Sequence, residues 1–249
     1  MHVVLGRTLD GGVFHANRLR NYQPSDVPGE GRRDTLAETF LLDAFLPTES
    51  VTSKEKVGSM PTKEKRELLI LRAIDFAARK HRDQRRKDEG ASPYINHPIS
   101  VSLLLAEIGG VADAEVLSAA ILHDTLEDTD TKTEELEAAF GLRVRKLVEE
   151  VTDDKSLVKP RRKELQISHA AQLTPDAVLI KLGDKISNVF DVTHAPPKDW
   201  NIQRRREYLD WAEAVVGNCR KVNSALEQHF SHVLAEGRRV LLSFDHGSS

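Results

Sequence analysis

Residues 116–130 read VLSAAILHDTLEDTD, and the fold and chemistry of the chain can be argued outward from this stretch. The first seven residues, VLSAAIL, are typical of the buried part of a helix. The last eight place four carboxylates around one histidine, His123. Like charges at helical spacing repel each other, so a helix that only had to fold would avoid this crowding. A divalent cation bound there would relieve the repulsion.

The chain around this stretch has a helical pattern almost throughout from residue 62 onward. Apolar residues recur at helical spacing, and Leu68, Leu71 and Ala78 are expected on one stripe. Residues 113–128 are expected to form one helix with Asp113 as its N-cap. No alternating run is long enough for a sheet. The sequence therefore predicts a single all-α bundle of about eight or more helices over residues 61–240, with a tail over 241–249.

Residues 1–60 have a different composition from the rest. Stretches such as QPSDVPGEG and LPTESVTSKEKVGS are typical of turns and linkers, so this extension is expected to be poorly ordered and to carry no chemistry. The chain has two methionines, and the second, Met60, directly precedes the first strongly periodic segment. A shorter form that starts at Met60 is therefore a hypothesis, with the extension dispensable.

Composition and charge exclude several classes of protein. The formal net charge of −3 gives no overall basic field for nucleic acid. No apolar run approaches the roughly 20 residues that span a bilayer. The single cysteine, Cys219, suits a reducing compartment, and we expect a cytoplasmic protein, with a mitochondrial location as the weaker alternative because of arginines near the N-terminus. The sequence carries no signal for the oligomeric state.

Four residues could form a metal site together. On a helix, His123 and Glu127 would share one face, as would Asp124 and Asp128. His97 begins the preceding helical segment, and Asp184 lies in an apolar stretch where an unpaired carboxylate is costly. Singly, each has an ordinary explanation: His97 as a cap, Asp184 paired with Lys181 or Lys185, and the acids as a solvated helix end. Together they form the pattern H…HD…D.

The types of ligand in this pattern favour certain metals. Two imidazoles and two carboxylates without a thiolate suit Mn²⁺, Fe²⁺ or Co²⁺. A structural zinc site would usually include cysteines. Four protein ligands on a six-coordinate ion leave room for water and a substrate oxygen, which is a catalytic arrangement.

The pattern H…HD…D resembles the signature of the HD phosphohydrolase superfamily. The stretches AARKHRDQRRKDEGASPYINHP, AAILHDTLEDTD, FGLRVRKLVEEVTDDKS and LIKLGDKISNV are similar to those of RelA/SpoT-type hydrolases of ppGpp, guanosine 3′,5′-bis(diphosphate). Among these, the small hydrolase-only group of animals, the metazoan SpoT homologues, is most similar. The resemblance covers about residues 62–235. It departs at Gly183, Phe190 and Val192, none of which is a proposed ligand.

The resemblance implies roles for individual residues. His97, His123, Asp124 and Asp184 would bind one Mn²⁺, and Glu127 and Asp128 would orient or deprotonate the attacking water. The implied reaction releases pyrophosphate from the 3′ position of ppGpp. Its implied substrate contacts are Arg86, Lys87, Lys159, Asn188, Arg204 and Tyr208, each of which could instead be an ordinary surface residue.

Three alternatives remain open at this point. The same site could remove the 2′-phosphate of NADPH, because both substrates present a phosphate on a ribose beside a purine. A general HD nucleotide phosphohydrolase is a second alternative, which the extended motifs disfavour. A catalytically inactive, nucleotide-binding HD module is a third, which the intact HD and ED pairs disfavour.

Overall fold

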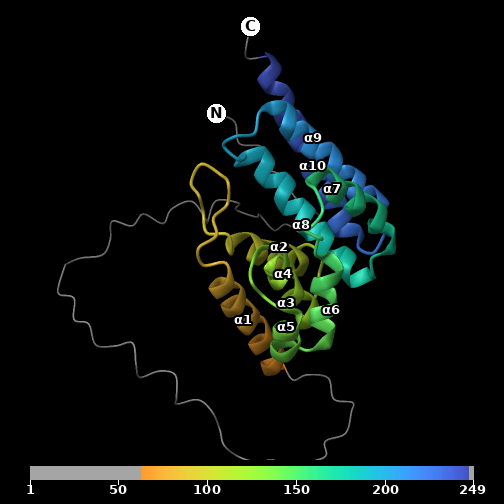
Figure 1. Cartoon of the computed structure of the whole chain (residues 1–249). Coiled ribbons are helices and arrows are strands. Elements are labelled where there is room, and N and C mark those ends of the chain that lie inside the picture. The colour runs from red at the N-terminus through yellow and green to blue at the C-terminus, as the bar shows by residue number, and fades with distance from the viewer. Residues whose placement is uncertain (1–62, 247–249) are drawn as a thin grey trace, which may run out of the picture. The chain divides into compact units, whose positions relative to one another are not determined.

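The computed structural model describes residues 63–246, so the expectations for residues 1–60 lie outside the described part of the chain. Within it the chain is helical without strands, apart from an isolated bridge between Arg85 and Pro93 (Figure 1). The helices are α1 (Lys63–Lys80), α2 (Asn96–Glu107), α3 (Ala114–Leu122), α4 (Thr125–Asp128), α5 (Thr133–Phe140), α6 (Leu142–Val151), α7 (Lys159–His169), the 3₁₀ turn η1 (Ala170–Gln172), α8 (Pro175–His194), α9 (Ile202–Asn218) and α10 (Ser224–His246). The predicted all-α fold is confirmed.

Helix α8 is the central element of the bundle. It packs against α2, α3, α6, α9 and α10. Twelve of its twenty residues are buried, which is what a helix covered from several sides requires. Thr174 caps its first turn by accepting from the backbone N–H of Ala177, and Pro175 takes the first helical position. A side chain on α8 therefore reaches the interior of the bundle.

The buried stripe of α1 differs from the prediction. Ala73, Phe76 and Ala77 face the core, whereas Leu68 and Leu71 are 48% and 62% exposed. The periodicity of the helix was assigned correctly, but its rotation about its axis was not. More than one row of apolar residues runs along α1, so packing against the other helices decides which row is buried.

The helix expected over residues 113–128 is broken after Leu122. Its N-cap is confirmed, because Asp113 accepts from the backbone N–H groups of Glu115 and Val116. At the other end, His123 Nδ1 donates to the carbonyl of Ala120, and Thr125 Oγ1 donates to that of Leu122, each at 2.7 Å. Side chains thus take the place of backbone donors in the last turn of α3. The prediction of one continuous helix was wrong, although a helical turn joins Asp124 to Asp128, whose backbone N–H donates to the Asp124 carbonyl at 2.8 Å.

The C-terminal part of the described chain contains two helices, α9 and α10. The chain leaves α9 at Cys219 and starts α10 at Ser224, and α10 continues past the expected domain boundary at residue 240 because Leu241 is buried. None of the helices in residues 63–246 is long and apolar enough to span a bilayer.

Candidate metal centre

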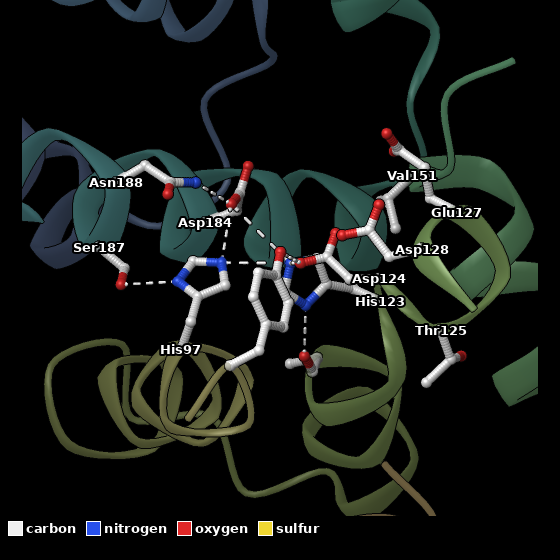
Figure 2. A network of polar contacts seen from close by, with 12 residues as sticks. His97, His123, Asp124, Thr125, Glu127, Asp128, Val151, Asp184, Ser187 and Asn188 are labelled. Carbon is white, nitrogen blue, oxygen red and sulfur yellow. Dashed lines mark hydrogen bonds and ion pairs between the residues drawn. The ribbon is translucent and has the colours of Figure 1, made fainter. Parts of the chain in front are cut away.

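Three side chains from different helices converge at the middle of the bundle (Figure 2). His97 lies in the first turn of α2, His123 directly follows α3, and Asp184 lies midway along α8. One ligand atom of each lies within 4.8 Å of one from each of the others. His97 Nε2 is 3.3 Å from Asp184 Oδ1, and His123 Nε2 is 3.8 Å from the same oxygen. Both histidines are buried, so this is an interior cluster.

The state of His123 suits a metal ligand. Its Nδ1 hydrogen is donated to the carbonyl of Ala120, so Nε2 carries the lone pair in the neutral ring. Nε2 lies 3.0 Å from Asp124 Oδ2, yet it is buried and makes no hydrogen bond. Although burial lowers the pKa of His123, Asp124 raises it to about 9. A buried nitrogen with no hydrogen-bond partner, facing carboxylates, fits a cation that would replace a proton.

Asp124 faces the same point from the break between α3 and α4. Its Oδ2 is 3.0 Å from His123 Nε2 and 3.8 Å from His97 Nε2. The hydroxyl of Tyr94 donates to this oxygen at 2.7 Å. Burial raises the pKa of Asp124, but His123 lowers it more, so the carboxyl is held well below its ordinary range. The short break after α3 is what turns Asp124 toward the two histidines.

Asp184 is held from its own helix. Lys185 Nζ donates to Oδ2 at 2.9 Å, and the side-chain amide of Asn188 donates to Oδ1. Against the effect of burial, Lys185 holds the pKa of Asp184 well below its usual value. Of the two alternative partners expected for Asp184, Lys185 is the one found, while Lys181 donates to the carbonyl of Val151. His97 is fixed in a comparable way, with Nδ1 3.1 Å from Ser187 Oγ.

Glu127 and Asp128 lie beside this cluster on α4. Glu127 accepts from the backbone N–H of Asp153 at 3.3 Å and from Arg162 at 3.4 Å. Burial, followed by the charge of Asp153, raises the pKa of Glu127 to about 7. Asp128 accepts from Gln84 at 2.9 Å and from Lys155. Figure 2 shows Asp128 next to Asp124, on the side away from His97.

A cavity of about 460 Å³ opens onto the cluster. His97 and Asp128 are on its wall, and so are four of the six predicted substrate contacts: Arg86, Lys87, Asn188 and Tyr208. The structure adds that Arg86 is already paired, since it donates to Asp191 and, at 3.2 Å, to Asn188 Oδ1. Burial raises the pKa of Tyr208 to about 12, so its hydroxyl keeps its proton.

The other two predicted contacts, Lys159 and Arg204, do not line the cavity themselves. They flank Trp200, which does, with Lys159 Nζ 5.9 Å and the Arg204 guanidinium 4.6 Å from the centre of its ring. The pKa of Lys159 is lowered by burial and then by the charge of Arg204. Unpaired positive charge is thus concentrated at this rim of the cavity.

Several residues of the site were not singled out from the sequence: Gln84, Tyr94, Arg162, Ser187, Asp191 and Trp200. Ser187 and Asp191 had a usable signal, because they lie three and seven residues after Asp184 and so share a face of the helix. Tyr94 and Gln84 lie in the loop between α1 and α2, where periodicity gives no information.

Comparison with known proteins is consistent with this geometry. A family model described as HD domain matches residues 73–210. The human protein named guanosine-3′,5′-bis(diphosphate) 3′-pyrophosphohydrolase MESH1 is 50% identical over 167 residues, which cover 67% of this chain and 93% of the human one. This chain belongs to the HD-domain family. Its resemblance to the metazoan SpoT-like group of that family is confirmed.

Further relatives place this HD domain in the same group. The protein with the same name in Drosophila melanogaster is 46% identical over 167 residues, covering 67% of this chain and 93% of its own. A solved structure described as a metazoan ortholog of SpoT that hydrolyzes ppGpp is 43% identical, with a TM-score of 0.66. The match covers 72% of this chain and 98% of that structure.

Proposed function

We propose that this HD domain hydrolyses ppGpp at its 3′-diphosphate, with water as the second reactant and GDP and pyrophosphate as products. The observation that carries the proposal is the convergence of His97, His123 and Asp184, with Asp124 beside them. It occurs in a chain that is 50% identical, over 167 residues, to a named ppGpp 3′-pyrophosphohydrolase. The wall of the adjacent cavity offers the cations that a substrate with two diphosphates needs.

His97, His123, Asp124 and Asp184 would hold one Mn²⁺ ion. The mixed imidazole and carboxylate set supports a borderline-to-hard ion, and the unpartnered Nε2 of His123 supports occupation by a cation. When bound, such an ion supplies a Lewis acid and lowers the pKa of a nearby water. The residues around it keep the ligands oriented: Lys185 and Asn188 fix Asp184, while Ser187 fixes the ring of His97.

Glu127 and Asp128 would accept the proton that the attacking water loses. A general base works best when its pKa lies near the working pH, and the value of about 7 for Glu127 supports that role. Asp128 is on the wall of the cavity, so its carboxylate can reach a water near the reacting phosphorus. Glu127 is held by Asp153 and Arg162, and Asp128 by Gln84 and Lys155, which supports a role in proton transfer apart from metal binding.

The substrate would lie in the cavity with its phosphates toward the positive rim. Lys87 on the wall and the pair of Lys159 and Arg204 around Trp200 suit the phosphates. Tyr208 and Asn188 are placed to bind polar groups of the ribose. Arg86 would act through its bonds to Asp191 and Asn188 as well as by contact with the substrate.

Product analysis in ¹⁸O-labelled water tests the reaction. The Mn²⁺-loaded full chain is incubated with ppGpp, and the products are identified by mass spectrometry. We expect GDP and pyrophosphate in equal amounts, with one ¹⁸O in the pyrophosphate, because water attacks phosphorus and the P–O bond to the ribose breaks. Release of orthophosphate from ppGpp would contradict the proposal. The same protein is assayed with NADPH to give kcat/KM for the alternative substrate. Turnover of NADPH without turnover of ppGpp would favour that alternative.

Metal removal tests the ion. Chelation should abolish hydrolysis, and added Mn²⁺ should restore it better than Mg²⁺ does, because imidazole ligands suit Mn²⁺ more than Mg²⁺. Full turnover by a preparation shown to be metal-free by elemental analysis would contradict a metal-dependent reaction.

A further inference from the structure

His81 is a buried polar residue for which the proposed reaction has no use. It directly follows α1, is 2% exposed, and its backbone N–H continues the helical ladder by donating to Ala77. Its Nδ1 lies 2.7 Å from the side-chain oxygen of Gln84. Its Nε2 is buried and has no hydrogen-bond partner. A buried acceptor left unpaired destabilises a fold, so a residue chosen for packing alone would not be a histidine here.

Hydrogen-bond chemistry fixes the direction of the contacts from His81 to the acid pair. Asp128 can only accept as a carboxylate, so Gln84 presents its amide nitrogen to Asp128 Oδ2, at 2.9 Å. The amide oxygen of Gln84 then faces His81, and Nδ1 of His81 must be the donor. His81 thus orients the Gln84 amide, and the amide orients Asp128. The Nδ1–H tautomer follows from the same argument.

The backbone of Gln84 is held as firmly as its side chain. Its N–H donates to the carbonyl of His81 at 2.9 Å, and its own carbonyl accepts from Tyr94 at 3.1 Å. Tyr94 stacks on the His81 ring at 5.0 Å between centroids and donates to Asp124. A single small unit therefore touches both Asp124 and Asp128. Such outer partners commonly set the orientation of the groups that they contact.

We propose that His81 and Gln84 form a relay that positions the Asp128 carboxylate for proton transfer, with His81 as a positioning residue that acts through Gln84. The inference rests on the proposed function for the part that Asp128 plays in turnover. The other oxygen of Asp128 contacts Lys155, whose side chain is 47% exposed. An exposed ion pair constrains a carboxylate weakly, so the partly buried relay is the stronger constraint.

Two substitutions of nearly equal size separate positioning from packing. Asn at position 81 carries an amide nitrogen where His81 has Nδ1, whereas Leu carries a methyl group there. We expect His81→Leu to lower kcat about 10- to 100-fold with the KM for ppGpp and the Mn²⁺ content unchanged, as for other outer partners of catalytic groups. His81→Asn should keep kcat much closer to the wild-type value. Lys155→Ala, which frees the other oxygen of Asp128, should lower kcat less than His81→Leu does.

A double-mutant cycle with Asp128→Asn locates the effect. If the relay acts through Asp128, His81→Leu causes no further loss of kcat once Asp128 is Asn. The same fold-loss in both backgrounds, equal activity of the Leu and Asn variants, or loss of Mn²⁺ in His81→Leu would each overturn the relay. Wild-type kcat for Asp128→Asn would overturn it too, by removing Asp128 from turnover.

A measurement that needs no activity tests the relay separately. Long-range ¹H–¹⁵N NMR spectra of the full chain loaded with diamagnetic Mg²⁺ report the tautomer of each histidine. We expect His81 with its proton on Nδ1, and a change of the Gln84 side-chain amide signals in His81→Leu but not in His81→Asn. A proton on Nε2 of neutral His81 would overturn the relay. Absence of ppGpp turnover by the wild type, with the Nδ1–H tautomer present, would count against the proposed function alone.

Discussion

At the scale of single residues, substitution of Glu127 tests whether metal binding and proton transfer are carried out by different residues. We expect Glu127→Gln to keep about one Mn²⁺ per chain while kcat falls by about 10²–10⁴, because Gln keeps the shape of Glu127 but cannot accept the proton. Metal content by elemental analysis and kcat for ppGpp are measured on the same preparation. His123→Ala is the matched comparison, since removal of a ligand should lower both quantities. Loss of metal from Glu127→Gln would show that Glu127 is a ligand instead.

The raised pKa of Glu127 also predicts how stability depends on pH. Burial and the charge of Asp153 raise this pKa from 4.5 to about 7, so the folded state holds the proton more tightly than the unfolded state. The stabilising contribution is complete below the unfolded pKa and is lost as the pH rises through about 7. Because Gln resembles the protonated acid, Glu127→Gln should gain stability relative to the metal-free wild type between pH 5 and pH 8. Urea unfolding at both pH values measures this, and an unchanged difference would contradict it.

The same residues indicate what a sequence can and cannot reveal about a site. The sequence predicted that His97, His123, Asp124 and Asp184 lie together, because metal chemistry limits which residue types can act together and because their motifs resemble a known family. Tyr94, Gln84 and Trp200 were not found. Each acts through a contact made across the bundle or in a loop, and neither periodicity nor charge pattern encodes such contacts.

At the scale of elements, the helix pattern was predicted well and the breaks were not. The end of α3 depends on His123 and Thr125 donating to backbone carbonyls, a choice that competes closely with one more helical turn. The division between α9 and α10 is similar, since the five residues between them contain neither Gly nor Pro. The exposed stripe of α1 was missed for a different reason: neighbouring helices set the rotation of a helix about its axis.

Gly237 of α10 lies where α10 packs closely against α8 and α9, so a larger residue there should destabilise the fold. A Cβ atom added at Gly237 of α10 would lie 2.6 Å from Thr193 Oγ1 of α8 and 3.0 Å from Leu209 Cδ2 of α9. Overpacking of this kind costs about 1–3 kcal/mol, more than the gain of about 0.5–1 kcal/mol from replacing a helical glycine with alanine. We therefore expect Gly237→Ala to lower the free energy of unfolding measured in urea.

The control for this prediction is Gly217→Ala in α9, where an added Cβ would meet no atom within 4 Å. That variant should be neutral or slightly more stable. If Thr193 causes the clash at Gly237, the added change Thr193→Ala should recover part of the lost stability. Equal unfolding free energies for Gly237→Ala and the wild type would show that the three helices separate at little cost.

At the scale of the whole molecule, the fold explains why the ligands come from distant parts of the sequence. Helix α8 runs through the middle of the bundle and brings Asp184 opposite the start of α2 and the end of α3. Each proposed ligand lies at a helix end or on a buried helix, so the core fixes its backbone position. The loop between α1 and α2 supplies the cavity with Arg86 and Lys87, where the substrate would be recognised.

The extension over residues 1–60 is expected to be dispensable for catalysis. The family match covers residues 73–210, and relatives of similar sequence use nearly their whole length to match about two thirds of this chain. A variant that begins at Met60 should therefore fold and keep kcat/KM for ppGpp within about twofold, since no proposed ligand and no residue lining the cavity beside the metal cluster precedes Gln84 in the described part of the chain. Circular dichroism checks the fold, and initial rates with Mn²⁺ check the activity. A folded variant with activity lost would show that the extension takes part in the reaction, which nothing in its composition predicts.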